Sequence, residues 1–183
     1  MIAVISPAKT LDYQSPLPAL DTTEPRFAGE AAALAKAAAK MSRKRLGELM
    51  HISDKLAALN AERFRTFDAL PERAAIRAFA GDVYTGLDAA TLDEAALDFA
   101  QDHLRMLSGL YGLLRPLDRM RPYRLEMGTR WAPRRKKLTD WWGGRIADAL
   151  AGDVAAEGSG VVLNLASQEY WAAVDGLLPL DIR

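Results

Sequence analysis

Cysteine is absent from the 183 residues of this chain, and histidine occurs only twice, as His51 and His103. The absence of cysteine excludes disulfides, thiolate nucleophiles and iron–sulfur or zinc sites built on thiolates. The two histidines lie far apart, and no carboxylate spacing resembles a calcium-binding loop, so we expect no metal site. The glycine-containing segment 81–86 lacks the Gly-Lys-Ser/Thr of a phosphate-binding loop, and we expect no bound cofactor.

The chain also lacks an excess of charge and any long apolar run. It has 24 basic and 24 acidic residues, so its formal net charge is zero. No uncharged apolar stretch approaches the roughly 18 residues of a membrane span. The start of the chain has neither the basic nor the long apolar region of a signal peptide. We therefore expect a cytoplasmic protein with no membrane partner.

Half of the residues are apolar, enough for a sizeable core. Short apolar runs at 2–5 and 161–165 predict buried strands, and 123–131 alternates as a strand does. Ala-rich composition, apolar spacing and capping residues predict helices. These helices are expected at 26–41, 43–50, 54–67, 91–107, 138–150 and 168–174. Without repeats or a Gly/Ser linker, residues 1–183 are predicted to form a single α/β domain with a central sheet and surrounding helices.

The charge is unevenly distributed along the chain. Residues 105–145 contain eleven lysines and arginines and three acids, a net charge of +8, so the remainder carries −8. Such asymmetry indicates either a polyanionic partner or a solvated basic face balanced by acidic neighbours. Within this region, residues 107–128 combine glycines, which let a backbone approach a ligand closely, with arginines suited to phosphate.

A helix–hairpin–helix element is one interpretation of this region. A helix ending at Leu107, a tight turn over 108–112 and a second short helix would present backbone N–H groups to a DNA phosphate. The predicted DNA-binding residues are Ser108, Gly109, Leu110, Tyr111, Gly112, Arg115, Arg119, Arg121 and Arg124. Contacts of this kind do not read base sequence. The alternative is an ordinary helical corner with a glycine C-cap.

A polar pocket at the ends of the strands is a second interpretation. Lys9, Thr10 and Asp12 follow the first strand, and Ser167, Glu169 and Tyr170 follow the late one. If the two strands are neighbours, these groups converge at the edge where open α/β sheets bind ligands. A further group would then join them: Arg121, Tyr123, Arg124 and Glu126. The pocket would suit a small anionic ligand and acid–base chemistry. Alternatively, these residues form structural ion pairs and turns.

Several long segments make the chain resemble the YaaA family of peroxide stress proteins. They are Ser6-Pro-Ala-Lys-Thr-Leu-Asp12, Ile52-Ser-Asp-Lys-Leu56, Gly81-Asp-Val-Tyr-Thr-Gly-Leu87, His103-Leu-Arg-Met-Leu-Ser-Gly-Leu-Tyr-Gly112, Arg115-Pro-Leu-Asp118, Pro122-Tyr-Arg-Leu-Glu-Met-Gly128 and Asn164-Leu-Ala-Ser167 with Glu169-Tyr170. The resemblance covers essentially the whole chain. Family members are longer, which implies that the C-terminal part of the domain is missing here.

The resemblance implies a cytoplasmic protein that limits peroxide damage by keeping unincorporated iron low. It also implies a family-specific α/β fold with a basic cleft and a helix–hairpin–helix-like element, and DNA binding without defined sequence preference. No settled enzymatic activity comes with it. The leading hypothesis is thus a DNA-binding stress protein. The competing hypothesis is an enzyme acting on a damaged base, nucleotide or phosphorylated metabolite, with Lys9, Asp12, Asp118 and Glu169 as catalytic candidates.

Overall fold

The computed structural model describes residues 1–16, 18 and 20–183 of the chain. Its main sheet, within that part of the chain, contains the strands β6 (Gly112–Leu114), β5 (Leu104–Ser108), β1 (Ile2–Ile5) and β8 (Val162–Asn164), in that order. β1 is parallel to β5 and β8, whereas β6 is antiparallel to β5. The two apolar runs predicted as strands are therefore neighbours. Shorter strands form the pairs β2 (Thr10–Leu11) with β4 (Phe79–Ala80), and β3 (Arg73–Ala74) with β7 (Arg119–Met120).

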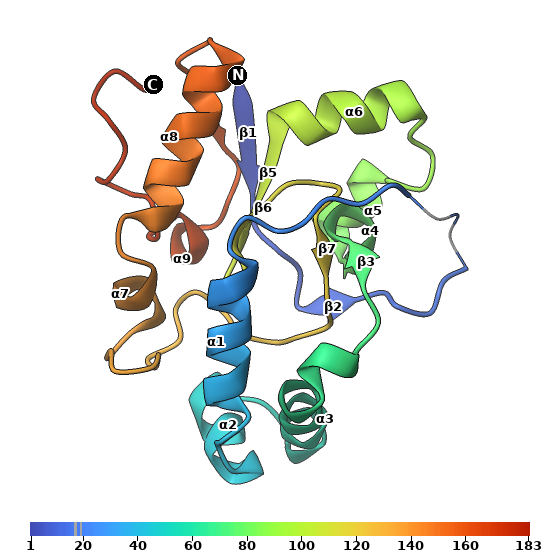
Figure 1. Cartoon of the computed structure of the whole chain (residues 1–183), viewed down its shortest axis with the longest axis vertical. Coiled ribbons are helices and arrows are strands. Elements are labelled where there is room, and N and C mark those ends of the chain that lie inside the picture. Colours follow the sequence, from blue (N-terminus) through green and yellow to red (C-terminus); the bar gives the residue numbers. More distant parts are fainter. Residues whose placement is uncertain (17, 19) are drawn as a thin grey trace.

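Helices cover both faces of the main sheet. The helices of the described part of the chain are α1 (Ala28–Ala38), α2 (Arg43–Met50), α3 (Asp54–Arg65), α4 (Ala75–Ala78), α5 (Asp82–Leu87), α6 (Glu94–His103), α7 (Leu138–Trp142), α8 (Arg145–Glu157) and α9 (Gln168–Trp171), with a 3₁₀ turn at Phe67–Ala69. α8 and α6 lie on opposite sides of the sheet (Figure 1). One large cluster of buried apolar side chains joins the sheet to α1, α8 and the loops between them. The α/β class is confirmed.

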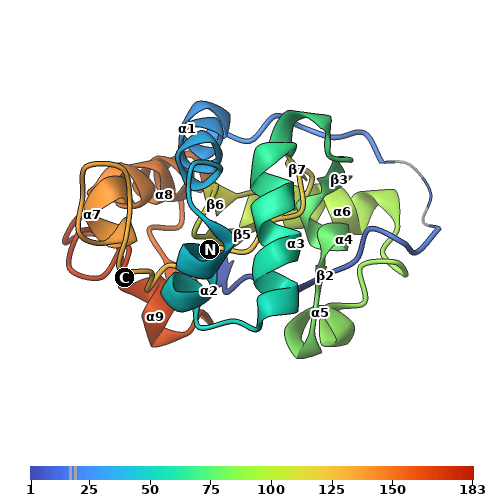
Figure 2. The same cartoon turned by 90° about the horizontal axis from the view of Figure 1, so that it is seen from below.

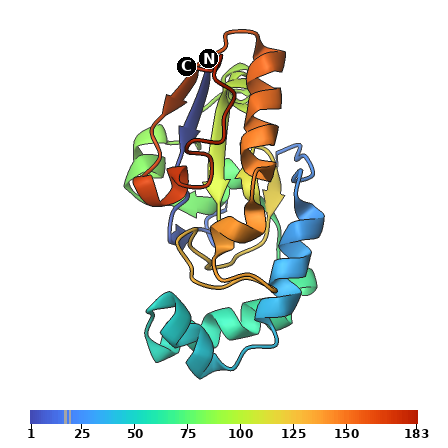
Figure 3. The ribbon, with the colours of Figure 1, turned by 90° about the vertical axis from the view of Figure 1, so that its left-hand side faces the viewer.

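A helical hairpin lies across the carboxyl ends of the parallel strands. α2 and α3 pack against each other below the end of β1, as Figure 3 shows from the side and Figure 2 from below. α2 ends at His51, whose backbone is left-handed with φ of 51°. After Ile52, the side chain of Ser53 caps α3 by accepting a hydrogen bond from the Leu56 N–H. This short connection brings the end of α2 over the loops that follow the strands.

The helix predicted over 91–107 is confirmed for 94–103, whereas its last four residues and the turn and helix predicted after it are wrong. α6 ends at His103, and residues 104–114 form the β5–β6 hairpin. The run from Arg105 to Leu114 is buried almost throughout. Apolar periodicity does not separate a buried strand from a helix, and here pairing with β1 decided the outcome. The chain therefore has no helix–hairpin–helix at this position.

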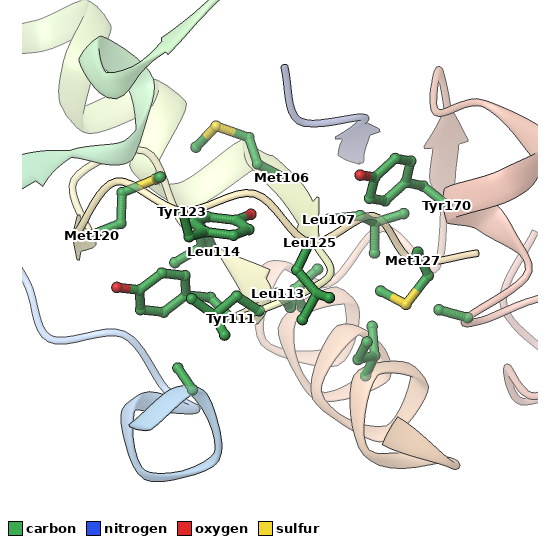
Figure 4. Packing of buried hydrophobic residues seen from close by; sticks show 14 of the residues in the cluster. Met106, Leu107, Tyr111, Leu113, Leu114, Met120, Tyr123, Leu125, Met127 and Tyr170 are labelled. Carbon is green, nitrogen blue, oxygen red and sulfur yellow. The ribbon is translucent and has the colours of Figure 1, made fainter. Parts of the chain in front are cut away.

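Both glycines of the Ser108–Gly112 bend are required by close packing. A Cβ on Gly109 would overlap the carbonyl oxygen of Leu125 and lie 2.9 Å from its carbonyl carbon. Gly112 has φ of 69°, and a Cβ there would lie 2.9 Å from the Trp142 ring. Figure 4 shows Tyr111, Tyr123 and Leu125 within the packed core around the bend. The glycines thus admit a neighbouring backbone and an indole ring.

The structure corrects two other local predictions, the first entirely and the second only at the Gly143-Gly144 break. Residues 123–131 form an irregular loop instead of a strand, and the helix predicted over 138–150 is divided into α7 and α8. Gly143, between them, has φ of 52°, which a continuous helix does not allow. The irregular loop matters most, because it carries Arg124, Glu126 and Arg130.

Replacing Gly109 by alanine should be far more costly than replacing a glycine with open space around it. Because the new methyl group would meet the Leu125 backbone, Gly109→Ala should lower the free energy of unfolding by at least about 3 kcal/mol. Gly152→Ala is the matched control, since nothing lies within 4 Å of a Cβ at that exposed α8 position. It should stabilise the protein by up to about 1 kcal/mol. Urea denaturation measures both, and equal effects would contradict the packing described.

Candidate functional site

The Ser108–Gly112 bend is inside the molecule. The side chains of Ser108 and Leu110 are fully buried, and Tyr111 is 3% exposed. The Ser108 hydroxyl accepts a hydrogen bond from the Tyr111 N–H at 2.8 Å and bonds the Tyr123 hydroxyl at 2.6 Å. The expectation of free amide donors at the surface is therefore wrong for this bend. A phosphate has no access to it in this structure.

The four arginines predicted to contact DNA each face a carboxylate. Arg115 bonds Asp118 at 2.9 Å, and Arg124 bonds Glu126 at 3.1 Å. Arg119 pairs with Glu24 and Glu72, and Arg121 pairs with Glu72 at 2.8 Å. A nearby carboxylate cancels most of the field that would attract a phosphate. Binding of DNA by these four side chains stays a prediction, but the helix–hairpin–helix on which it was based is not present at this position.

A basic loop farther along the chain has no such compensation. Arg130, Arg134, Arg135, Lys136 and Lys137 are all exposed, and none of them forms an ion pair with a residue that the structure describes. We call residues 130–137 the basic loop. Its chain reverses at Arg134, whose φ is 60°, between paired residues Ala132 and Arg135. Its charge belongs to the basic region recognised in the sequence, although none of its residues is among the predicted DNA-binding residues.

A cavity of about 550 Å³ lies between the strand-end loops and the helical hairpin. It is lined by Lys9, Arg45, Glu48, Leu49, Met50, His51, Arg124, Glu126, Gly128, Thr129, Arg130 and Glu169. We call this space the strand-end cavity. Because β1 and β8 are neighbours, the loops after them bring Lys9 and Glu169 to one place, as the sequence predicted.

Glu169 is positioned by the loop that faces it. Its Oε1 accepts a hydrogen bond from the Gly128 N–H at 3.1 Å. A Cβ on residue 128 would lie 2.8 Å from the same oxygen, so only glycine allows this approach without displacement of Glu169. Arg124 is held in turn by Glu126, whose Oε1 accepts a hydrogen bond from the Arg124 Nε–H at 3.1 Å and lies 3.1 Å from Nη2 in an ion pair. The cavity therefore contains oriented acid, base and anion-binding groups.

The tyrosines behind the strand-end cavity remain protonated. Tyr123 and Tyr170 line a smaller space that shares Lys9, Arg124 and Glu126 with the cavity. Burial raises the pKa of both phenols above their ordinary value. They are therefore neutral hydrogen-bonding groups at physiological pH. Thr10, Ser167 and Arg121, grouped with the pocket in the sequence, do not line the cavity.

Asp12 and Asp118 are structural residues outside the cavity. Asp12 accepts hydrogen bonds from the N–H groups of Gln14 and Ser15, both at 2.9 Å, and lies 3.7 Å from Arg73. Asp118 is 1% exposed and accepts from Arg115 and from the Thr23 hydroxyl. Of the four catalytic candidates, the structure thus brings together only Lys9 and Glu169.

Sequence reasoning missed the contribution of the helical hairpin to the cavity. Arg45 and Glu48 lie on α2 and His51 is its C-cap, all more than 70 positions before Arg124. The only sequence feature that pointed to the hairpin was the segment 52–56, which carries part of the family resemblance but contains no obvious catalytic or ligand-binding motif. Within the described residues, no three His, Asp or Glu side chains are grouped so as to hold a metal ion. No helix in that part of the chain is both long and apolar enough to span a bilayer.

Asp12 should make stability depend on pH at the acidic end. Hydrogen bonds from Ser15 and Gln14 lower the pKa of Asp12 from 3.8 to about 2. A carboxyl whose pKa is lower in the folded state stabilises the protein above the unfolded value, so this contribution is complete above about pH 4 and is lost as the pH falls toward 2. Asp12→Asn should remove that part of the pH dependence. Carboxyl NMR titration gives the pKa directly, and an ordinary value for Asp12 would contradict its role in the turn.

The chain is similar over its length to known proteins. The model of a family described as "Peroxide stress protein YaaA" matches residues 1–180. A UPF0246 protein of Rhizorhabdus wittichii is 63% identical over 184 residues, an alignment that covers 100% of this chain and 73% of the relative. Another UPF0246 protein, from Idiomarina loihiensis, is 54% identical over 179 residues, covering 95% of this chain and 69% of the relative.

Proposed function

Because the chain belongs to the peroxide stress protein YaaA family, we propose that it protects the cell during peroxide stress by binding DNA through backbone phosphates. The contacts lie along the basic loop instead of at the Ser108–Gly112 bend. The observation that carries this proposal is the set of five exposed cations without carboxylate partners among the described residues. Phosphate contacts of this kind bind DNA without reading its sequence. The proposal places the protein in the cytoplasm.

Control of loosely held iron is the second part of the proposal. Ferrous iron converts peroxide into hydroxyl radicals that damage DNA, so lowering it complements the binding of DNA. Control of iron is supported only by the chain's membership of a family whose description is peroxide stress protein. The corresponding measurement is chelatable iron in peroxide-treated cells with and without the protein.

Neutralising the basic loop should weaken DNA binding for all sequences alike. The triple variant Arg135→Gln/Lys136→Gln/Lys137→Gln should lose at least about tenfold in affinity at 0.1 M salt and reduce the slope of log affinity against log salt by about 3. The matched control is Arg119→Gln/Arg121→Gln, which removes arginines already paired with Glu24 and Glu72. Fluorescence anisotropy with duplexes of two sequences gives both quantities. An unchanged salt slope in the triple variant would exclude the basic loop as the DNA contact.

Catalysis in the strand-end cavity is a second candidate function. It is favoured by one observation, the convergence of Lys9, Arg124, Glu126 and Glu169 in a single space. Carboxylates and an amine so placed are suited to general acid–base work on a small anionic substrate. The proposed substrate is a damaged base, a nucleotide or a phosphorylated metabolite.

Substitution of Lys9 distinguishes the two candidate functions, DNA binding and catalysis. Because Lys9 is in the cavity and not in the basic loop, Lys9→Ala should abolish turnover while leaving DNA affinity within about twofold, the change expected for one exposed, salt-screened charge outside the loop. Turnover is assayed by chromatography of a nucleotide mixture incubated with the protein, and DNA affinity by anisotropy. Turnover that persists in Lys9→Ala would remove Lys9 from the catalytic set, and a large loss of DNA affinity would place it in the DNA contact.

A further inference from the structure

The strand-end cavity contains cations that no carboxylate neutralises. Its lining includes four basic side chains, Lys9, Arg45, Arg124 and Arg130, and three acidic ones. Arg124 is bonded to Glu126, and Arg45 lies 4.0 Å from Glu48 on an exposed turn of α2. Lys9 and Arg130 form no ion pair with any residue that the structure describes. These two side chains are therefore available to an anionic group on a ligand.

Glu169 gives the same cavity a carboxylate with free acceptor positions. Among the described residues, only the Gly128 N–H bonds its side chain, and no cation lies within 4.0 Å of it. A carboxylate fixed in this way repels a second anion and accepts hydrogen bonds from N–H groups. The ligand should thus combine one anionic group with a separate hydrogen-bond donor edge.

The size and the walls of the cavity favour an organic ligand over a simple inorganic ion. Pockets for small organic ligands range from about 300 to 1,000 Å³, and this cavity measures about 550 Å³. Leu49 and Met50 add apolar surface to the lining. An apolar wall beside charged groups suits a ligand with a flat, partly apolar ring.

We propose that the strand-end cavity binds a nucleoside monophosphate, with the phosphate at Lys9 and Arg130 and the donor edge of the base at Glu169. Guanine fits best, because its adjacent imino and amino groups donate together to one carboxylate. Thymine fits worst, because its single N–H is flanked by carbonyl oxygens that Glu169 repels. The proposal rests on the cavity of the second candidate function, but it requires binding alone and no turnover.

Gly128 is a positioning residue for this recognition. The three atoms nearest to a Cβ on residue 128 all belong to Glu169, at 2.8, 3.2 and 3.3 Å, so a side chain there would displace that carboxylate first. Gly128→Ala should therefore weaken the binding of guanine nucleotides while leaving that of a sugar phosphate unchanged. A merely structural role for the glycine would not separate these two ligands.

Calorimetric titration of the full chain with dGMP, TMP, ribose 5-phosphate and inorganic phosphate tests the proposal. We expect dGMP to bind most tightly and TMP to bind at least about fivefold more weakly, as expected when a donor pair is replaced by a repulsive edge. Glu169→Gln keeps an oxygen for the Gly128 N–H, and it should weaken dGMP about tenfold without affecting ribose 5-phosphate. Lys9→Ala should weaken every phosphate ester about tenfold.

Lys55→Ala is the control for loss of a lysine, since Lys55 is exposed on α3 outside the cavity. It should bind all four ligands as the unaltered chain does. The proposal is overturned if dGMP binds no more tightly than inorganic phosphate, or if Lys9→Ala and Glu169→Gln behave like Lys55→Ala. The basic-loop triple variant should bind dGMP normally. Loss of DNA binding, loss of turnover and loss of nucleotide binding can therefore be distinguished from one another.

Discussion

The contact between Gly109 and the backbone of Leu125 is the constraint on which the site depends. It places the loop 123–130 directly against the β5–β6 hairpin, where no side chain on residue 109 would fit. The bond between the hydroxyls of Ser108 and Tyr123 holds the same two segments together from inside the core. The loop has no sheet pairing of its own, so this packing gives Arg124, Glu126 and Gly128 their positions at the cavity.

The fold separates two kinds of basic residue that look alike in the sequence. The arginines between residues 115 and 124 bond carboxylates and fasten loops to the core, as Arg115 does with Asp118. The cations of the basic loop have no such partners among the described residues and stay in solvent. One region of charge +8 therefore contains both a structural network and an exposed surface, and only the exposed surface is suited to a polyanion.

The strand-end cavity and the basic loop meet at Arg130, which belongs to both. A nucleic acid lying along the loop would have its phosphates near the mouth of a cavity of nucleotide size. The helical hairpin closes the other side, because α2 lies across the ends of the strands (Figure 3). The proposed sites for a polymer and for a single nucleotide are thus adjacent in the structure and share Arg130, whereas their other residues differ.

The sequence by itself determined the α/β class, the strands β1 and β8 and most of the helices, and it predicted that Lys9 and Glu169 converge if those two strands are neighbours. These follow from local composition and from the rule that parallel strands end at the same edge of a sheet. Tertiary structure alone decided that 104–114 is a buried hairpin, that Asp12 and Asp118 serve turns and ion pairs, and that Arg45 and His51 line the cavity. The physical reason is that burial removes the periodic signal of a strand, and that a charge acquires its partners only in three dimensions.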